Sequence, residues 1–419
     1  VIYFTGVESN EKQNLENFSQ SIMSYKSDLP QGSEFTSFQD ALEFVFKLAQ
    51  EKRIVLVIDE YPYVAKASKS LASTLQLMID KHKDASKLFL ILCGSSMSYM
   101  EDHVLAYKAP LYGRRTAQLK VQPFEFMEAC KHFPKFAAED KAIAYGIVGG
   151  TPQYLLQLDD GLSIKENIKK IFLNPSSFLF EEPTNLLKQE VREPAIYNAI
   201  ITAIATGGTK LSEISSKVGE DTSVCATYIR NLISLGIVKK ETPYGESSGR
   251  KTIYSIEDNM FRFWYRFVPE NNSIIARGAA DLAYKRIEPY LSDYMGAVFE
   301  DISKQHLWNE LLNDNCPVNF TDIGRWWGTN KKTRQQEEID IMGVQDKTTA
   351  LFGECKWTNE KVDLAVLEKL IERSELFNYK NKHFYLFAKS GFTKGCIRKA
   401  EEMGNVRLVE YSEMLKEVK

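Results

Sequence analysis

Short, unbroken runs of aliphatic residues alternate with amphipathic stretches over the first hundred residues. Ile54–Ile58 is one such run, Leu88–Cys93 is another, and Val1–Thr5 predicts a third strand. Apolar residues recur every three or four positions between these runs, which predicts helices over 10–24, 38–51 and 68–83. Strands alternating with helices indicate a parallel α/β sheet, and strands without polar positions suit a sheet covered on both faces.

Two carboxylates, Asp59 and Glu60, directly follow the run Ile54–Ile58. The carboxyl ends of parallel strands meet at the edge where open α/β sheets bind their ligands. Adjacent acids there suit the two Walker B roles. Asp59 would hold Mg²⁺, and Glu60 would orient and deprotonate the attacking water. The same pattern also fits an ordinary buried strand that ends in a polar turn.

Polar residues further along could contribute to the same site. Ser95 and Ser96 follow the second aliphatic run, where a hydroxyl can reach a γ-phosphate, although both also suit a helix N-cap. Arg114 and Arg115 lie beside a glycine and suit phosphate or a partner subunit's site, although a solvated loop is the favoured interpretation. The stretch Gly149-Gly-Thr-Pro-Gln-Tyr154 ends one helix and starts another.

In this order, the acidic strand end, Gly94-Ser95-Ser96, Pro110–Arg115 and Gly149–Tyr154 resemble the prokaryotic and archaeal ATPases of the STAND/AAA+ branch of P-loop NTPases. The resemblance implies an ATPase that uses ATP and Mg²⁺, followed by a winged helix-turn-helix. It also implies, as in many members, a C-terminal domain similar to the PD-(D/E)xK nucleases.

The chain departs from this family in one respect. No Gly-x-x-x-x-Gly-Lys-Ser/Thr loop occurs in residues 1–419, although backbone amides and a lysine of such a loop cradle the phosphates. The first residues already read as the middle of a buried strand. We therefore expect the chain to be cut off before or within the Walker A region; a divergent pseudo-ATPase is the alternative.

Composition adds constraints on compartment and partners. Six cysteines without a Cys-x-x-Cys pair and five isolated histidines predict neither a zinc site nor a disulfide framework, and fit a reducing cytoplasm. No apolar run approaches the roughly 20 residues of a membrane span. The net charge of −3 means that any nucleic-acid contact must come from a local patch.

The middle of the chain has the element order of a winged helix-turn-helix. Helices are predicted over 190–206, 211–218 and 223–235, and two strands follow around a turn at 243–249. Arg230 on the last helix and Arg250 and Lys251 on the wing would contact DNA phosphates. Neighbouring acids make a packing module an equal alternative. The aromatic run Met260–Phe267 suits packing at helical spacing better than base stacking.

The C-terminal region contains a complete catalytic pattern. Asp340 lies on one predicted strand, and Glu354 and Lys356 lie two apart, hence on one face, of the next. Glu300 lies on an upstream helix that could reach the same pocket. An Asp, a Glu-x-Lys and a helical Glu together resemble PD-(D/E)xK nucleases. Alternation alone fits a surface hairpin equally well, but the spacing, the helical Glu300 and the position after a winged helix favour the nuclease-like fold.

The residue types suit phosphodiester hydrolysis. Glu300, Asp340 and Glu354 would hold Mg²⁺ against the phosphate, and Lys356 would steer the attacking water and offset the developing charge. The preceding loop forms a basic patch suited to a phosphate backbone, made of Arg325, Lys331, Lys332 and Arg334. Domains of this type are sometimes inactive binding modules.

The chain is therefore predicted to be an α/β multidomain protein in four parts. These are an incomplete parallel-sheet P-loop ATPase core (1–160), a helical linker (161–189), a winged helix-turn-helix (190–268) and a PD-(D/E)xK nuclease-like domain (269–419). The predicted function is that of an ATP-hydrolysing, DNA-associated protein with a metal-dependent nuclease-like domain. The alternative is a nucleotide-switched regulator or scaffold whose nuclease-like domain is inactive. A protein partner and an oligomer are both compatible with the sequence.

Overall fold

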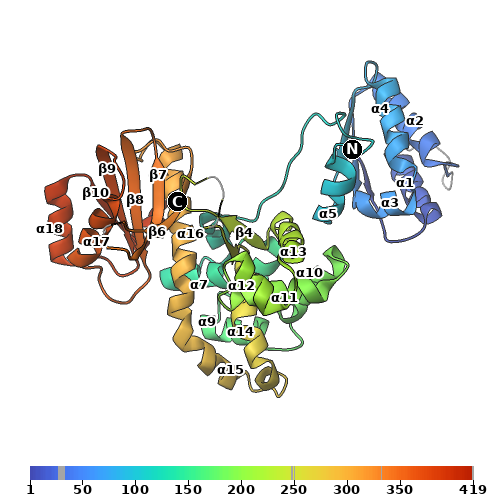
Figure 1. Ribbon diagram of the computed structural model, residues 1–419. Helices are drawn as coiled ribbons and strands as arrows, with labels where there is room; N and C mark the ends of the chain where they lie inside the picture. Colours follow the sequence, from blue (N-terminus) through green and yellow to red (C-terminus); the bar gives the residue numbers. More distant parts are fainter. Residues whose placement is uncertain (27–33, 247–248, 250, 332, 418–419) are drawn as a thin grey trace. The chain divides into compact units, whose positions relative to one another are not determined.

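The computed structural model describes residues 1–26, 34–246, 249, 251–331 and 333–417. The chain forms two compact units, Val1–Val121 and Gln122–Lys419 (Figure 1). Each unit is described by itself below. Among the described residues, no helix combines the length and the apolar character needed to cross a bilayer.

The first unit is built on a parallel sheet of three strands in the order β1-β2-β3. Its elements are β1 (Ile2–Thr5), α1 (Glu11–Tyr25), α2 (Phe38–Glu51), β2 (Ile54–Asp59), α3 (Tyr61–Ala67), α4 (Leu71–His82), β3 (Leu88–Leu92) and α5 (Met97–Tyr99). The predicted parallel α/β arrangement is confirmed. The helix predicted over 68–83 begins at Leu71, after the separate short helix α3.

One face of this sheet is buried and the other is more open. Ile54, Leu56 and Ile58 of β2 pack in one core with residues of α1, α2 and α4. On the opposite face, Phe89 is 46% exposed and Ile91 is 37% exposed. The prediction that these strands are covered on both faces is therefore wrong for the described part of this unit. Aliphatic residues at every position permit a second cover but do not supply one.

The second unit begins with helices. They are α6 (Phe126–Ala129), α7 (Ala138–Val148), α8 (Pro152–Leu155), α9 (Ile164–Ile171), α10 (Phe178–Glu190), α11 (Pro194–Ala205), α12 (Leu211–Val218) and α13 (Thr222–Ser234). An antiparallel hairpin, β4 (Val238–Glu241) and β5 (Ile253–Ile256), follows, and then α14 (Asn259–Ile275). Alternate residues of the aromatic run, from Phe261 to Phe267, are buried in α14. This confirms their packing role.

A mixed sheet of five strands completes the second unit, in the order β10-β9-β8-β7-β6. Strands β6, β7 and β8 are antiparallel neighbours, whereas β8, β9 and β10 run parallel. The elements are α15 (Ala280–Ile287), α16 (Leu291–Leu312), β6 (Ile323–Thr329), β7 (Gln336–Val344), β8 (Thr349–Lys356), α17 (Leu364–Ser374), β9 (Asn381–Ala388), α18 (Lys394–Met403), β10 (Val406–Glu410) and α19 (Tyr411–Met414). The cores on the two faces of the sheet include residues of α16 on one side and of α17 and α18 on the other.

The loop of the β4–β5 hairpin is hydrogen-bonded to the edge of this sheet. The Tyr244 amide donates to the Arg325 carbonyl at 2.9 Å. The Tyr244 hydroxyl donates to the Asp322 carbonyl at 3.2 Å and accepts from the Val344 amide at 3.1 Å. The hairpin is therefore fixed to β6 and to the end of β7.

A cluster of charged residues joins the hairpin to two long helices. Asp301 of α16 accepts hydrogen bonds from Lys239 of β4 at 3.3 Å and from Arg262 of α14 at 3.2 Å. Burial alone would raise the pKa of Asp301, but Lys239, Arg262 and Lys304 lower it well below its usual range. Asp301 is therefore an ionised carboxylate that links three elements through their cationic side chains.

Candidate functional site

The acidic end of β2 brings Glu60 into contact with Ser95, which follows β3. Glu60 adopts a left-handed conformation with φ of 49°, which is uncommon outside glycine and concentrates at functional sites. Its carboxylate accepts from the Ser95 hydroxyl at 3.1 Å and from the Ser95 amide at 3.4 Å. The structure thus brings together two residues predicted from separate strands. Ser96, the other predicted hydroxyl, is the N-cap residue of α5. Its hydroxyl oxygen lies 3.5 Å from the hydroxyl oxygen of Ser98.

A tyrosine that sequence reasoning missed also touches this site. The Tyr3 hydroxyl on β1 donates to Asp59 at 2.8 Å, and this hydrogen bond is the main reason that the pKa of Tyr3 is raised. The register of β1 on β2 places Thr5 opposite Asp59, so Tyr3 reaches along the strand. Its position two residues before Thr5, on the same strand face, was the available signal.

The two loop arginines contact other parts of the first unit. Arg114 forms a two-pronged ion pair with Asp80 of α4, at 2.8 and 2.7 Å. Arg115 donates to the Leu105 carbonyl at 3.3 Å and lies over the ring of Tyr112. These contacts engage both arginines within the first unit, and nucleotide binding by either one stays a prediction.

The second candidate site forms where the ladder between β7 and β8 ends. Its last pair is Ile341 opposite Gly353, so Asp340 and Glu354 stand one step beyond. On the other side, β6 and β7 change register: one residue, Arg325, faces two, Asp340 and Ile341. This two-against-one arrangement is a β-bulge, a device that redirects side chains near functional sites. Regular alternation in the sequence did not predict it.

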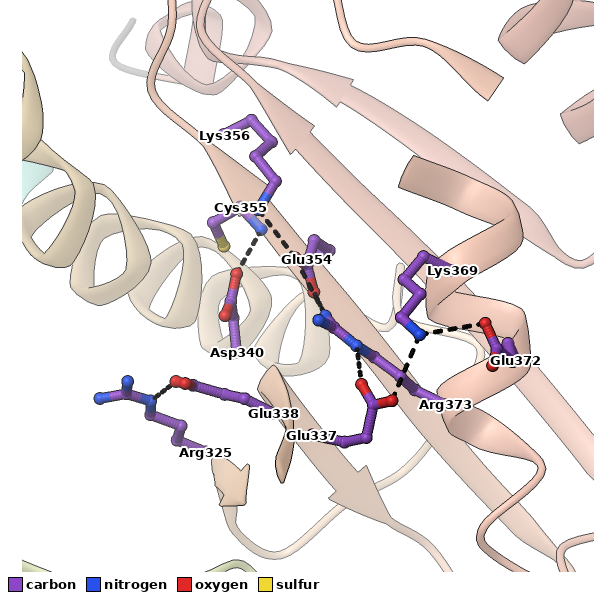
Figure 2. Close-up of polar contacts among 10 residues, drawn as sticks. All are labelled: Arg325, Glu337, Glu338, Asp340, Glu354, Cys355, Lys356, Lys369, Glu372 and Arg373. Carbon is purple, nitrogen blue, oxygen red and sulfur yellow. Dashed lines mark hydrogen bonds and ion pairs between the residues drawn. The ribbon is translucent and has the colours of Figure 1, made fainter. Parts of the chain in front are cut away.

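Asp340 interacts electrostatically with two other carboxylates, Glu354 and Glu300. Its Oδ2 accepts from the Cys355 amide at 2.9 Å, which fixes it to β8 (Figure 2). Burial and the charge of Glu354 raise the pKa of Asp340 to about 6. Burial and the charge of Asp340 raise the pKa of Glu300 on α16 to about 7. The charge of Glu354 thus acts on Asp340, and the charge of Asp340 acts on Glu300.

The predicted lysine also reaches this site. Lys356 Nζ donates to Glu354 at 2.7 Å. Burial acts to lower the pKa of Lys356, but Glu354 and Asp340 raise it above its usual value, so the ammonium group stays charged. Glu354 and Lys356 lie on one face of β8, as their spacing predicted.

Metal binding here would rest on the oxygens of Asp340 and Glu354. Carboxylate oxygens are the ligands that Mg²⁺ prefers, and the mutual repulsion of the two acids favours a cation between them. Within the ranges that the structure describes, no three His, Cys, Asp or Glu side chains are gathered closely enough to hold an ion. Glu300 therefore does not form one group with the other two. The pair fits a metal whose remaining positions are filled by water and substrate, as Mg²⁺ commonly is.

A network on α17 surrounds Glu354 and was missed by sequence reasoning. Arg373 donates through Nη1 to both oxygens of Glu354, at 3.3 and 3.2 Å, and through Nε to Glu337 at 3.0 Å (Figure 2). Lys369 donates to Glu337 at 3.2 Å. The four-residue spacing of Lys369 and Arg373 puts both on one helix face, which was the signal available in the sequence.

The predicted nucleic-acid residues are dispersed over the second unit. Arg230 is exposed on α13 and donates to Thr227 at 3.1 Å. Lys251 pairs with Glu246 at 2.6 Å. Lys331 and Arg334 are exposed in the turn between β6 and β7, where Arg334 has a φ of 61°. Arg250 and Lys332 lie outside the described residues.

The raised pKa of Glu300 predicts a pH-dependent stability difference. An acid whose pKa is higher in the folded state costs stability as pH rises through its folded pKa. Glu300→Gln removes this cost, so its stability relative to the unsubstituted protein should grow by about 2 kcal/mol between pH 5 and pH 8. Urea unfolding in EDTA at both pH values measures it. The exposed Glu288→Gln is the control, and a difference independent of pH would contradict the prediction.

The class of the first part of the chain follows from β2, its acids and a family match. Residues 1–158 match a family described as an ATPase domain predominantly from Archaea, and residues 264–367 match a family described as archaeal and bacterial proteins of unknown function. The first part of the chain thus matches an archaeal type of ATPase domain.

A relative defines the family more closely. The uncharacterized protein MJECL04 of Methanocaldococcus jannaschii is 34% identical over 362 residues, which cover 86% of this chain and 78% of that protein. The chain belongs to the family of this archaeal protein.

Two solved structures share a more distant likeness. The Orc1 protein of Aeropyrum pernix, solved in complex with DNA, is 11% identical, with a TM-score of 0.29 over 66% of this chain and 80% of that one. The protein VC1899 of Vibrio cholerae is 12% identical, with a TM-score of 0.26 over 99% and 88%. Neither TM-score is high enough to support an argument.

Proposed function

We propose that this ATPase cuts DNA through a PD-(D/E)xK-type site in its C-terminal domain, with Mg²⁺ held by Asp340 and Glu354. The observation that carries the proposal is the position of Asp340. A bulge redirects it to the end of the β7–β8 ladder, beside Glu354 and Lys356, and its charge raises the pKa of Glu300. Acids that repel one another at a strand end, next to a charged lysine, suit metal-assisted hydrolysis.

Each side chain has a separate role in this proposal. Asp340 and Glu354 hold the metal, which when bound polarises the phosphate and supplies positive charge. Lys356 steers the attacking water and offsets negative charge that develops on the phosphate oxygens. Glu300, with its pKa of about 7, would accept a proton near neutral pH.

The rest of the second unit would present the DNA. We assign α11, α12, α13 and the β4–β5 hairpin to a winged helix-turn-helix, because three helices followed by an antiparallel hairpin have its element order. Arg230 is exposed on the last of these helices, and Lys331 and Arg334 are exposed next to β7. The four-part domain division predicted above belongs to this proposal. ATP bound to the first unit would regulate cleavage.

The test is cleavage of circular and linear DNA by the intact protein with Mg²⁺ or Mn²⁺. The double variant Asp340→Ala, Glu354→Ala should lose at least about 100-fold in rate, because it removes the metal ligands. Glu372→Gln is the matched control, since this acid lies in the neighbouring network but pairs with Lys369. Equal cleavage by the double variant would disprove the site assignment.

A second candidate is a nucleotide-switched scaffold that binds DNA or protein without cutting. The hold of Arg373 on both oxygens of Glu354 favours it, because a carboxylate neutralised by a guanidinium is a weaker metal ligand. DNA retention without cleavage, at any divalent metal concentration tested, would select this candidate.

A further inference from the structure

Glu354 is the most heavily engaged carboxylate of the candidate site. Its side chain is only 8% exposed. It accepts three hydrogen bonds from two cations, one from Lys356 and two from Arg373. A carboxylate has about four lone-pair positions, so these bonds use most of its capacity. A metal ion that binds Glu354 must therefore compete with Arg373, which contacts both carboxylate oxygens.

Arg373 has a second anchor that does not depend on Glu354. Its Nε donates to Glu337 at 3.0 Å, and Glu337 is buried with a side chain 4% exposed. A buried carboxylate needs paired cations, and Glu337 has two, Arg373 and Lys369. The guanidinium can thus leave Glu354 while the hydrogen bond from its Nε to Glu337 is kept.

We propose that Arg373 is a clamp that holds Glu354 in the metal-free protein and must be displaced before a divalent metal binds. The inference rests on the proposed metal site and concerns its regulation. Glu337 already binds the guanidinium and can hold it after it leaves Glu354. Glu354 and Glu337 therefore compete for one arginine (Figure 2). Metal affinity is then set by this competition as well as by the ligands.

The clamp predicts changes of opposite sign in two variants. Arg373→Gln frees Glu354 and removes a positive charge, so Mn²⁺ should bind about 10-fold more tightly. Glu337→Gln removes the competing charge and leaves Arg373 on Glu354, so Mn²⁺ should bind about threefold or more weakly. Arg398→Gln is the matched control. Arg398 pairs only with Glu402 at 3.6 Å among the described residues and its side chain is 78% exposed, so its loss should change the affinity less than about twofold.

The measurement is titration calorimetry of Mn²⁺ into the full chain after EDTA treatment, at one pH, with unfolding midpoints recorded for every variant. Loss of the binding heat in Asp340→Asn, Glu354→Gln shows that the signal comes from this site. Unchanged or weaker binding in Arg373→Gln overturns the clamp, even when the protein cuts DNA. If Arg373→Gln binds Mn²⁺ and the unsubstituted protein does not, the clamp is supported, because Arg373 then blocks the site completely. A folded Arg373→Gln that binds no Mn²⁺ overturns it, and absent cleavage separately overturns the proposed nuclease function.

Discussion

Replacing Asp301 by asparagine is expected to destabilise the second unit by about 2–4 kcal/mol. The substitution removes the carboxylate that forms ion pairs with both Lys239 and Arg262, at 3.3 and 3.2 Å. Arg262 is 15% exposed in its side chain, so its charge cannot turn fully to water. Removing one partner of a buried ion pair leaves an uncompensated charge, which costs far more than the pair contributes. The expected loss of stability is smaller than for a fully buried ion pair, because the Asp301 side chain is 26% exposed.

Urea unfolding of the full chain, followed by tryptophan fluorescence, measures this loss. Asp281→Asn is the matched control. Asp281 also pairs with a lysine, Lys169 at 2.7 Å, but its side chain is 68% exposed, so the loss should stay under about 1 kcal/mol. Equal effects of the two substitutions would show that the cluster around Asp301 is no stronger than a surface ion pair.

Gly150→Ala is the second substitution with a large expected effect. A Cβ at Gly150 would lie 1.8 Å from the Phe124 carbonyl oxygen, which is backbone and cannot turn aside. The two residues are also joined by a hydrogen bond from the Phe124 amide to the Gly150 carbonyl at 2.9 Å. The added methyl group must therefore separate two hydrogen-bonded segments, and we expect a loss of about 3 kcal/mol or more.

Gly296→Ala is the control for this substitution, because no atom of the described residues outside its own helix turn and its chain neighbours lies within 4 Å of a Cβ built there. Gly296 lies inside α16, where alanine is the better helix former, so a gain of about 0.5–1 kcal/mol is expected. Both stabilities come from the same urea unfolding experiment. A loss under about 1 kcal/mol in Gly150→Ala would show that the backbone near Phe124 moves easily.

Local patterns predicted the elements of this chain well. The helix over Phe38–Glu51 and the helix over Leu211–Val218 begin and end where their apolar spacing placed them. Strong amphipathic periodicity and clear flanking polar residues account for this success. The Gly-Gly-Thr-Pro stretch was predicted only as a helix break. Its reason, the close approach to Phe124, involves a segment about 26 positions away that no local pattern specifies.

The candidate sites were predicted in part. Glu60 with Ser95, and Asp340 with Glu354 and Lys356, come together because strand ends and strand parity are readable from sequence. Covering of both sheet faces in the first unit was predicted wrongly, since apolar strands permit a cover without specifying one. The bulge at Asp340 and the hold of Arg373 on Glu354 depend on pairing register and helix packing, which arise only in the folded chain.

The hydrogen bonds of Tyr244 determine how often the β4–β5 hairpin detaches from the five-stranded sheet. Three hydrogen bonds of Tyr244 join it to β6 and β7, and each contributes about 0.5–1.5 kcal/mol net. Releasing the loop therefore costs about 1.5–4.5 kcal/mol, so roughly one molecule in ten to one in two thousand has it free at any moment. The hairpin and β7, the strand that carries Asp340, therefore remain hydrogen-bonded to each other in most molecules and move together. A ligand that shifts the hairpin also shifts the site.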